Sequence, residues 1–222
     1  MTVAADLAAR KEAIVERSFA TMYADPFWRE RFGERGERYT REDHGYHVSY
    51  LSEAVRAGDA AVFASYLRWL QPVLTSRGMC TKHLEDSLLA VRDAIVAEGI
   101  DGAEIEVHVE AARAALRYPH GVARSIQEAA SRLAPVITTR VGFERTNDVL
   151  HLLSYVADAI ALANDDVLVR HVRWLADRTP PRADGALLDS MVEASAALDP
   201  EVAAPYGRLI AKAGLAIAPE AA

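Results

Sequence analysis

The sequence SYLSEAV at residues 49–55 returns as SYVADAI at residues 154–160. The alignment continues without a gap to RWL, which stands at residues 68–70 and again at 173–175. Seven of the 22 aligned positions are identical, namely 49, 50, 54, 62, 68, 69 and 70 in the first stretch. Self-similarity of this kind predicts that one structural unit occurs twice in the fold.

Apolar residues recur at spacings of three and four almost throughout, and alternating β patterns bounded by turn residues are absent from the sequence. We therefore expect an all-α protein with a single helical-bundle domain over residues 1–222. After a shift of two residues, DSLL at 86–89 aligns with DSMV at 189–192, so each copy should span three helices. The two copies should pack against each other about a pseudo-twofold axis.

About ten helices are expected, together with a short aromatic turn at residues 26–28. Their predicted ranges are 4–23, 41–57, 60–76, 81–97, 102–117, 120–137, 143–162, 165–177, 184–197 and 200–214. Copy one covers about 41–97, the linker helices about 102–137, copy two about 143–197 and the C-terminal helix about 200–214.

Composition narrows the class of protein. Of the 222 residues, 51% are hydrophobic and 26% charged, which is typical of a folded globular chain. The net charge of −7 argues against a general nucleic-acid binder, because neutralising phosphates requires a basic face. The single cysteine, Cys80, excludes an intramolecular disulfide and fits a reducing compartment. The charged N-terminus and the lack of a long apolar run predict a cytoplasmic protein without a signal peptide or membrane span.

Polar side chains fall on several apolar stripes. His47 and Tyr50 lie on the inward stripe of the helix at 41–57, where copy two has Leu152 and Tyr155. Further members of such stripes are Tyr66, its counterpart His171, and His108 of the unrepeated helix at 102–117.

Three inward histidines invite a metal or haem interpretation, with His47 and His171 as candidate metal ligands. The alternative is that each histidine is a neutral core residue bonded to a tyrosine or a backbone carbonyl. Both interpretations stay open on the sequence alone.

Common catalytic motifs are missing from the chain. It has no Gly-rich phosphate loop, no Gly-x-Ser-x-Gly elbow, no Cys-x-x-Cys-His haem attachment and no His-Glu-x-x-His zinc motif. The ligand set of a di-iron bundle cannot be assembled either. Trp69 and Trp174 recur at one place in the two copies, after Arg68 and Arg173. They fit packing between copies, or stacking on a ligand.

The stretch at 41–51, followed by FASYLRWL at 63–70, resembles the helical region that precedes the cobalamin-binding domain of bacterial B12-dependent regulators. The shared pattern is Asp-x-x-Tyr-His-x-x-Tyr-Leu and then Tyr-x-Arg-Trp-Leu. The resemblance covers residues of about 26–97, with copy two as a weaker echo. It implies a sensory or ligand-binding helical module. The cobalamin-binding module with its Asp-x-His-x-x-Gly motif does not follow; a second helical copy stands there instead.

Three functions are therefore open. The first is a cytosolic small-molecule-binding or sensory protein, with haem or another tetrapyrrole as the leading ligand. Its pocket would lie between the copies, lined by His47, Tyr50, Tyr66, His108, Tyr155 and His171. The second is a metal- or haem-dependent enzyme of specialised metabolism in the same pocket. The third is a non-catalytic interaction or scaffold protein, which binds a regulatory protein partner or a second copy in a homodimer and exposes an apolar patch.

Overall fold

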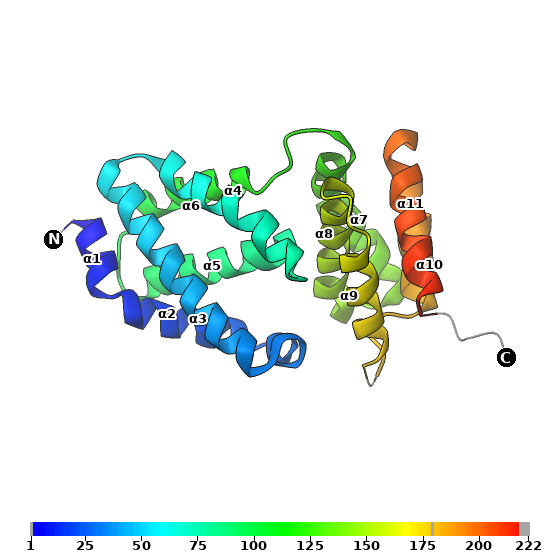
Figure 1. Cartoon of the computed structure of the whole chain (residues 1–222), viewed down its shortest axis with the longest axis horizontal. Helices are drawn as coiled ribbons and strands as arrows, with labels where there is room; N and C mark the ends of the chain where they lie inside the picture. Colours follow the sequence, from blue (N-terminus) through cyan, green and yellow to red (C-terminus); the bar gives the residue numbers. More distant parts are fainter. Residues whose placement is uncertain (1, 179, 218–222) are drawn as a thin grey trace. The chain divides into compact units, whose positions relative to one another are not determined.

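The computed structural model describes residues 2–178 and 180–217. Over these residues the all-α prediction is confirmed, since eleven α-helices and two 3-10 turns are present and no strand is formed (Figure 1). The helices are α1 (Val3–Ala9), α2 (Lys11–Tyr23), α3 (Pro26–Ala57), α4 (Ala60–Ser76), α5 (Thr81–Ala97), α6 (Gly102–Ala115), α7 (Gly121–Val141), α8 (Thr146–Ala161), α9 (Asp166–Ala176), α10 (Gly185–Ala194) and α11 (Pro200–Leu215). The 3-10 turns are η1 (Phe143–Arg145) and η2 (Ser195–Ala197).

The N-terminal region departs most from the predicted ranges. The expected helix at 4–23 is two helices, because Arg10 leaves the helical conformation between α1 and α2 with φ −106° and ψ 12°. The expected turn at 26–28 is the start of α3, which is capped by Asp25 and has Pro26 in its first turn. At Gly33 the helix is kinked, with φ 59° and ψ −162°, a conformation that glycine adopts without steric cost.

The described chain forms two compact units. Unit 1 contains the residues up to Gln71 and His83–Leu116, and unit 2 contains Pro72–Lys82 and the residues from Arg117 onward. Copy one therefore falls mostly in unit 1 and copy two in unit 2. The last turn of α4 and the start of α5 belong to unit 2.

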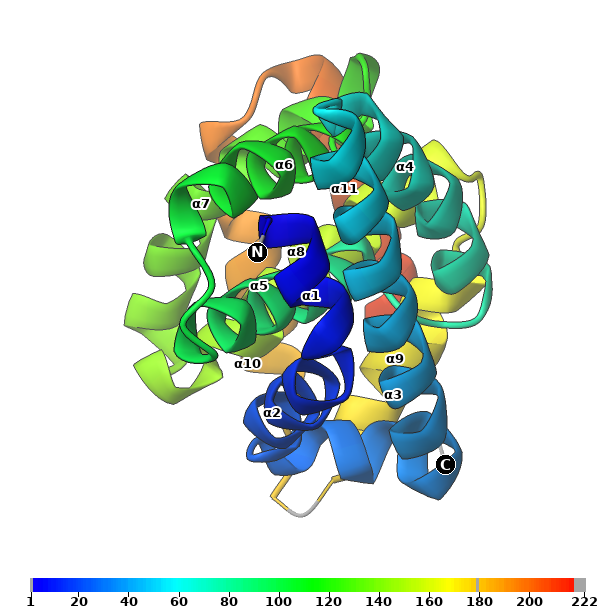
Figure 2. The same cartoon turned by 90° about the vertical axis from the view of Figure 1, so that its left-hand side faces the viewer.

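In unit 1, α1 and α2 pack along α3, and α6 also contacts α3 (Figure 2). The helices bury the stripes that the three- and four-residue spacing predicts. Fully buried apolar side chains include Ile14, Val48, Leu51, Phe63, Leu67, Leu88, Ile95, Ile105 and Val109.

In unit 2, α7 packs against α8, and α10 packs against α7 and α11. The core contains Ile137, Val149, Leu152, Tyr155, Leu168, Leu187, Met191 and Ile210. Cys80 from the segment Pro72–Lys82 is completely buried in this core.

The two copies end their first helix in the same way. Gly58 and its counterpart Ala163 both have left-handed backbone conformations, with φ of 63° and 49°. The next residue donates its backbone N–H across this turn in each copy, Asp59 to the Ala54 carbonyl and Asn164 to the Ala159 carbonyl. The sequence repeat is therefore also a repeat of backbone geometry.

The left-handed positions Gly58 and Ala163 predict opposite changes in the free energy of unfolding when their residue types are exchanged. Alanine at a left-handed position is strained and glycine is not, so Ala163→Gly should raise the free energy of unfolding by about 0.5–1 kcal/mol. Gly58→Ala should lower it by a similar amount, because no atom lies within 4 Å of the added Cβ and only backbone strain changes. Urea unfolding followed by circular dichroism measures both; a loss of stability in Ala163→Gly contradicts the explanation.

Candidate functional site

The six predicted site residues divide between the two units. His47, Tyr50, Tyr66 and His108 belong to unit 1, and Tyr155 and His171 belong to unit 2. Within unit 1 the first three come together, and within unit 2 the last two do.

The same aromatic stack occurs in both copies. In unit 1 the rings of Tyr50 and Tyr66 are stacked, with centroids 4.0 Å apart and planes 10° apart. In unit 2 their counterparts Tyr155 and His171 are stacked at 4.2 Å and 26°. The tryptophan that the two copies share lies next to this stack. The ring centroid of Trp69 is 6.4 Å from that of Tyr66, and the ring centroid of Trp174 is 5.9 Å from that of His171. The stack therefore connects the first two helices of each copy.

His47 lies behind the stack of unit 1 and is fully buried. Its Nδ1 lies 3.0 Å from the Tyr66 hydroxyl and its Nε2 lies 3.3 Å from the Ser87 hydroxyl, so both ring nitrogens have hydrogen-bonding partners. Burial lowers the pKa of His47 to about 4 and keeps the ring neutral near pH 7. Burial also raises the pKa of Tyr66, and the negative charge of Asp43 adds to this shift.

His44 is a second buried histidine one turn before His47. Its Nδ1 lies 2.7 Å from the Ser18 hydroxyl of α2. Burial lowers the pKa of His44 to about 3, and the neighbouring His47 adds to the shift. Nε2 of His44 has no hydrogen-bond partner among the described residues.

His108 lies apart from the stack, on α6. It is 5% exposed, and its Nδ1 donates to the Glu104 carbonyl at 2.9 Å. This is a local bond to the backbone, as a histidine in a helical core commonly makes.

Tyr50 is exposed where the sequence predicts a buried position, and Trp69 is more exposed still. Tyr50 is 42% exposed and Trp69 is 62% exposed, so the prediction of an inward Tyr50 is wrong. The reason is that Tyr50 lies at the edge of the stripe, where its ring covers Tyr66 and leaves its outer side open. Tyr46 is also exposed, one turn earlier on α3. We call Tyr46, Tyr50 and Trp69, together with the buried Tyr66 beneath them, the aromatic face.

The equivalent surface of copy two is covered. Tyr155 is completely buried and donates its hydroxyl to the Gly78 carbonyl at 2.7 Å. The backbone N–H of Lys82 donates to the Ser154 hydroxyl at 3.0 Å. The segment Pro72–Lys82 thus lies on the surface of α8 that corresponds to the aromatic face.

Asp158, which the sequence reasoning did not select, fixes this segment. Its carboxylate accepts the backbone N–H of Thr81 at 2.7 Å, the Thr81 hydroxyl at 2.6 Å and the Tyr118 hydroxyl at 2.7 Å. Burial raises the pKa of Asp158 to about 6, although these hydrogen bonds favour the charged form. The only signal in the sequence is an acidic residue, Asp158, beside the apolar stripe of this helix and aligned with Glu53.

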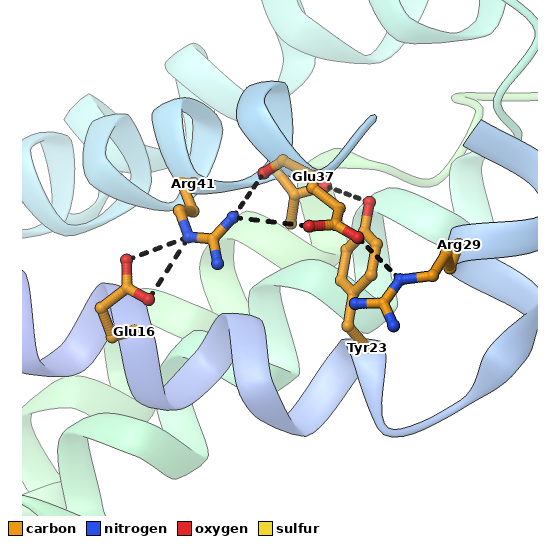
Figure 3. Close-up of polar contacts among 6 residues, drawn as sticks. Glu16, Tyr23, Arg29, Glu37 and Arg41 are labelled. Atoms are coloured by element: carbon orange, nitrogen blue, oxygen red, sulfur yellow. Dashed lines mark hydrogen bonds and ion pairs between the residues drawn. The ribbon is translucent and has the colours of Figure 1, made fainter. Parts of the chain in front are cut away.

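A charged network holds the kink of α3 (Figure 3). Arg41 bonds to Glu16 of α2 at 3.0 Å and lies within 4.0 Å of Glu37, and Glu37 accepts from Arg29 at 2.7 Å. Because Arg29 precedes Gly33 and Glu37 follows it, the network joins both sides of the kink. The guanidinium of Arg41 also lies 3.4 Å above the Phe19 ring, which adds a cation–π contact.

The described residues contain no group of three or more His, Cys, Asp or Glu side chains placed to hold a metal ion. Open hollows occur among the described residues, and two of them each lie within one unit. One, of about 590 Å³, lies beside Arg17 and Glu98, and one, of about 440 Å³, lies beside Asp165, Arg208 and Lys212. None of the predicted site residues lines either hollow. No described helix has the length and apolar character required to cross a membrane.

Comparisons with known proteins gave no relationship from which a function could be transferred. No protein family matches the chain, and no curated protein and no solved structure is significantly similar to it.

Unit 1 is expected to lose stability in acid. His44 and His47 remain neutral in the folded state down to a pKa of about 3 and 4, whereas in the unfolded chain they take up protons near pH 6.5. The two neutral histidines contribute fully to the free energy of unfolding above pH 6.5, and this contribution is lost as the pH falls toward 4. The slope should approach about 2.7 kcal/mol per pH unit for the two groups together.

The double variant His44→Val/His47→Leu, which carries the residues found at 149 and 152 of copy two, tests this expectation. Urea unfolding at pH 7 and pH 5 should show a smaller loss than in the wild type, whatever the stability at pH 7. An unchanged loss between these pH values would mean that other groups carry the acid sensitivity.

Asp158→Ala should release the segment Pro72–Lys82. The buried Thr81 N–H and Tyr118 hydroxyl lose their acceptor, and the expected destabilisation is about 2–4 kcal/mol. Cys80, the only thiol of the chain, should then react faster with a thiol reagent under native conditions. The matched control is Glu53→Ala at the aligned exposed position, which should change stability by less than about 0.5 kcal/mol and leave the reactivity of Cys80 unchanged.

Proposed function

We propose that this protein is a non-catalytic interaction protein and that the aromatic face of unit 1 binds a protein partner. The exposure of Trp69, Tyr46 and Tyr50 carries the proposal, with exposed fractions of 62%, 58% and 42%. Exposed large aromatic side chains gathered over two helices are typical of binding surfaces, where tryptophan and tyrosine supply much of the energy.

The rings are held in place before any partner arrives. Tyr50 is stacked on Tyr66, and Tyr66 shares a hydrogen bond with His47, which is itself held by Ser87. An anchor that is already ordered loses little side-chain entropy on binding. This support is consistent with a structural role for His47.

The size of the face fits the centre of an interface. Aromatic side chains have surfaces of roughly 150–250 Å² each, so three half-exposed rings present only a few hundred Å². A stable protein interface buries about 800 Å² on each partner. The surrounding polar residues of α3 and α4 would form the rim.

The tetrapyrrole and metal-enzyme interpretations have weaker support. A metal bound at His47 would displace the hydroxyl of Tyr66 or Ser87, and His171 lies between the rings of Tyr155 and Trp174. Supplying haem during expression tests the first of these. A Soret band that disappears in His47→Ala or His171→Ala would favour a haem protein over the function proposed here.

Site-specific photo-crosslinking in the native host tests the proposed function. The photoreactive residue p-benzoylphenylalanine replaces Trp69 in the test protein and Val107 in the control, because Val107 of α6 is equally exposed, at 64%, and lies outside the aromatic face. We expect a crosslinked protein adduct at position 69, identified by mass spectrometry, and none above background at 107. Equal labelling at both positions, or none at 69, would rule out the aromatic face as a protein-binding surface.

A further inference from the structure

We propose that the partner of the aromatic face is a second copy of this chain, whose loop between α9 and α10 lies on the face in a head-to-tail arrangement. The proposal rests on the proposed function and names its partner. It follows from the way in which copy two covers the corresponding surface.

In unit 2, a loop of copy one occupies the surface of copy two. Residues 78–82 end the connection from α4 and begin α5, and they bond to Tyr155, Ser154 and Asp158 of α8. In the alignment, these three residues of α8 correspond to Tyr50, Ser49 and Glu53 of α3. The surface that accepts a connecting loop in copy two is thus the aromatic face and its border in copy one.

The border of the aromatic face offers groups for such a loop, although the Ser49 hydroxyl already accepts from Lys11 at 2.7 Å. Tyr50 is 42% exposed, whereas Tyr155 is completely buried and its hydroxyl bonds to the Gly78 carbonyl. Glu53 is exposed and pairs with Arg56, which is an exposed pair of small energetic value. Asp158 in the same position binds the loop through two hydrogen bonds from Thr81 and accepts a third from the Tyr118 hydroxyl.

The alignment also identifies the occupant. The segment 78–82 corresponds to residues 181–185, which lead into α10 as 78–82 lead into α5. Pro181 of this segment and the preceding Pro180 are exposed. Proline rings pack well on tyrosine and tryptophan, and a proline segment loses little backbone entropy when it binds.

Residues 182–184 are held in place by contacts within unit 2. Arg182 bonds to Asp148 at 2.9 Å, Asp184 bonds to Arg145 at 3.0 Å and caps α10, and Ala183 is 2% exposed. These contacts fix residues 182–184, and the two prolines before them are exposed. Each chain therefore carries one aromatic face and one outward proline loop, which is the requirement for a heterologous contact.

Sedimentation velocity of the purified full chain, over a range of concentrations, tests the proposal. The face variant is Tyr50→Ala/Trp69→Ala and the loop variant is Pro180→Ser/Pro181→Ser. The wild type should form dimers and larger species as the concentration rises, because head-to-tail contacts leave both ends open. Each variant alone should be a monomer, with its fold checked by circular dichroism. Mixed together, the two variants should form a dimer and nothing larger, since only one intact face meets one intact loop.

Other outcomes overturn the proposal in distinguishable ways. A loop variant that still dimerises by itself indicates a symmetric face-to-face contact. A wild type that is monomeric at every concentration excludes self-association. If the crosslink at position 69 then contains a different protein, the proposed function stands and only the identity of the partner is wrong; if no adduct forms there, both fail.

Discussion

The stack between the first two helices of each copy is the contact on which the rest of both units depends. Tyr50 on Tyr66 and Tyr155 on His171 join helices that are close in sequence, with centroids 4.0 Å and 4.2 Å apart. Flat rings in face contact restrict the rotation of one helix about the other. The left-handed residues Gly58 and Ala163 set the direction of the chain between these helices. Together they fix which stripe of each helix faces the core.

The same contact has a different surrounding in each unit. Above Tyr155 the chain places residues 78–82, anchored by the buried carboxylate of Asp158. Above Tyr50 no described residue has this role, and the ring is 42% exposed. A duplicated unit that keeps its internal packing and changes only what covers it can acquire a binding surface without altering its core. This is why exposure, more than the identity of any buried polar residue, supports a function in binding.

The fold class and the repeat could be predicted because both depend on local periodicity. Helix ranges such as 60–76 and 81–97 agree with α4 and α5, since the apolar stripes and caps that define them are contiguous in sequence. The kink at Gly33 could not be predicted in the same way, because contacts between distant residues hold it, such as the bond from Arg41 to Glu16 of α2. The break at Arg10 is marked by no glycine or proline in the sequence. The periodicity also placed Tyr50 on the buried stripe, although it lies at the edge. The role of Asp158 could not be predicted from the sequence, because its partners Thr81 and Tyr118 are 77 and 40 residues away.

The positions at which the two copies differ gain a simpler interpretation from the structure. The sequence pairs His47 with Leu152 and Tyr66 with His171, which suggested two separate functional positions. In unit 1, however, His47 and Tyr66 are bonded to each other at 3.0 Å, so the two differences concern one contact. The Tyr66 hydroxyl supplies His47 with one of its two hydrogen-bond partners. Where leucine stands at 152, no hydroxyl is required at 171, and an imidazole ring can take the place of the phenol in the stack. The exchange therefore preserves the packing of each copy, and the exposed rings around Tyr66 are the part of copy one that packing alone does not explain.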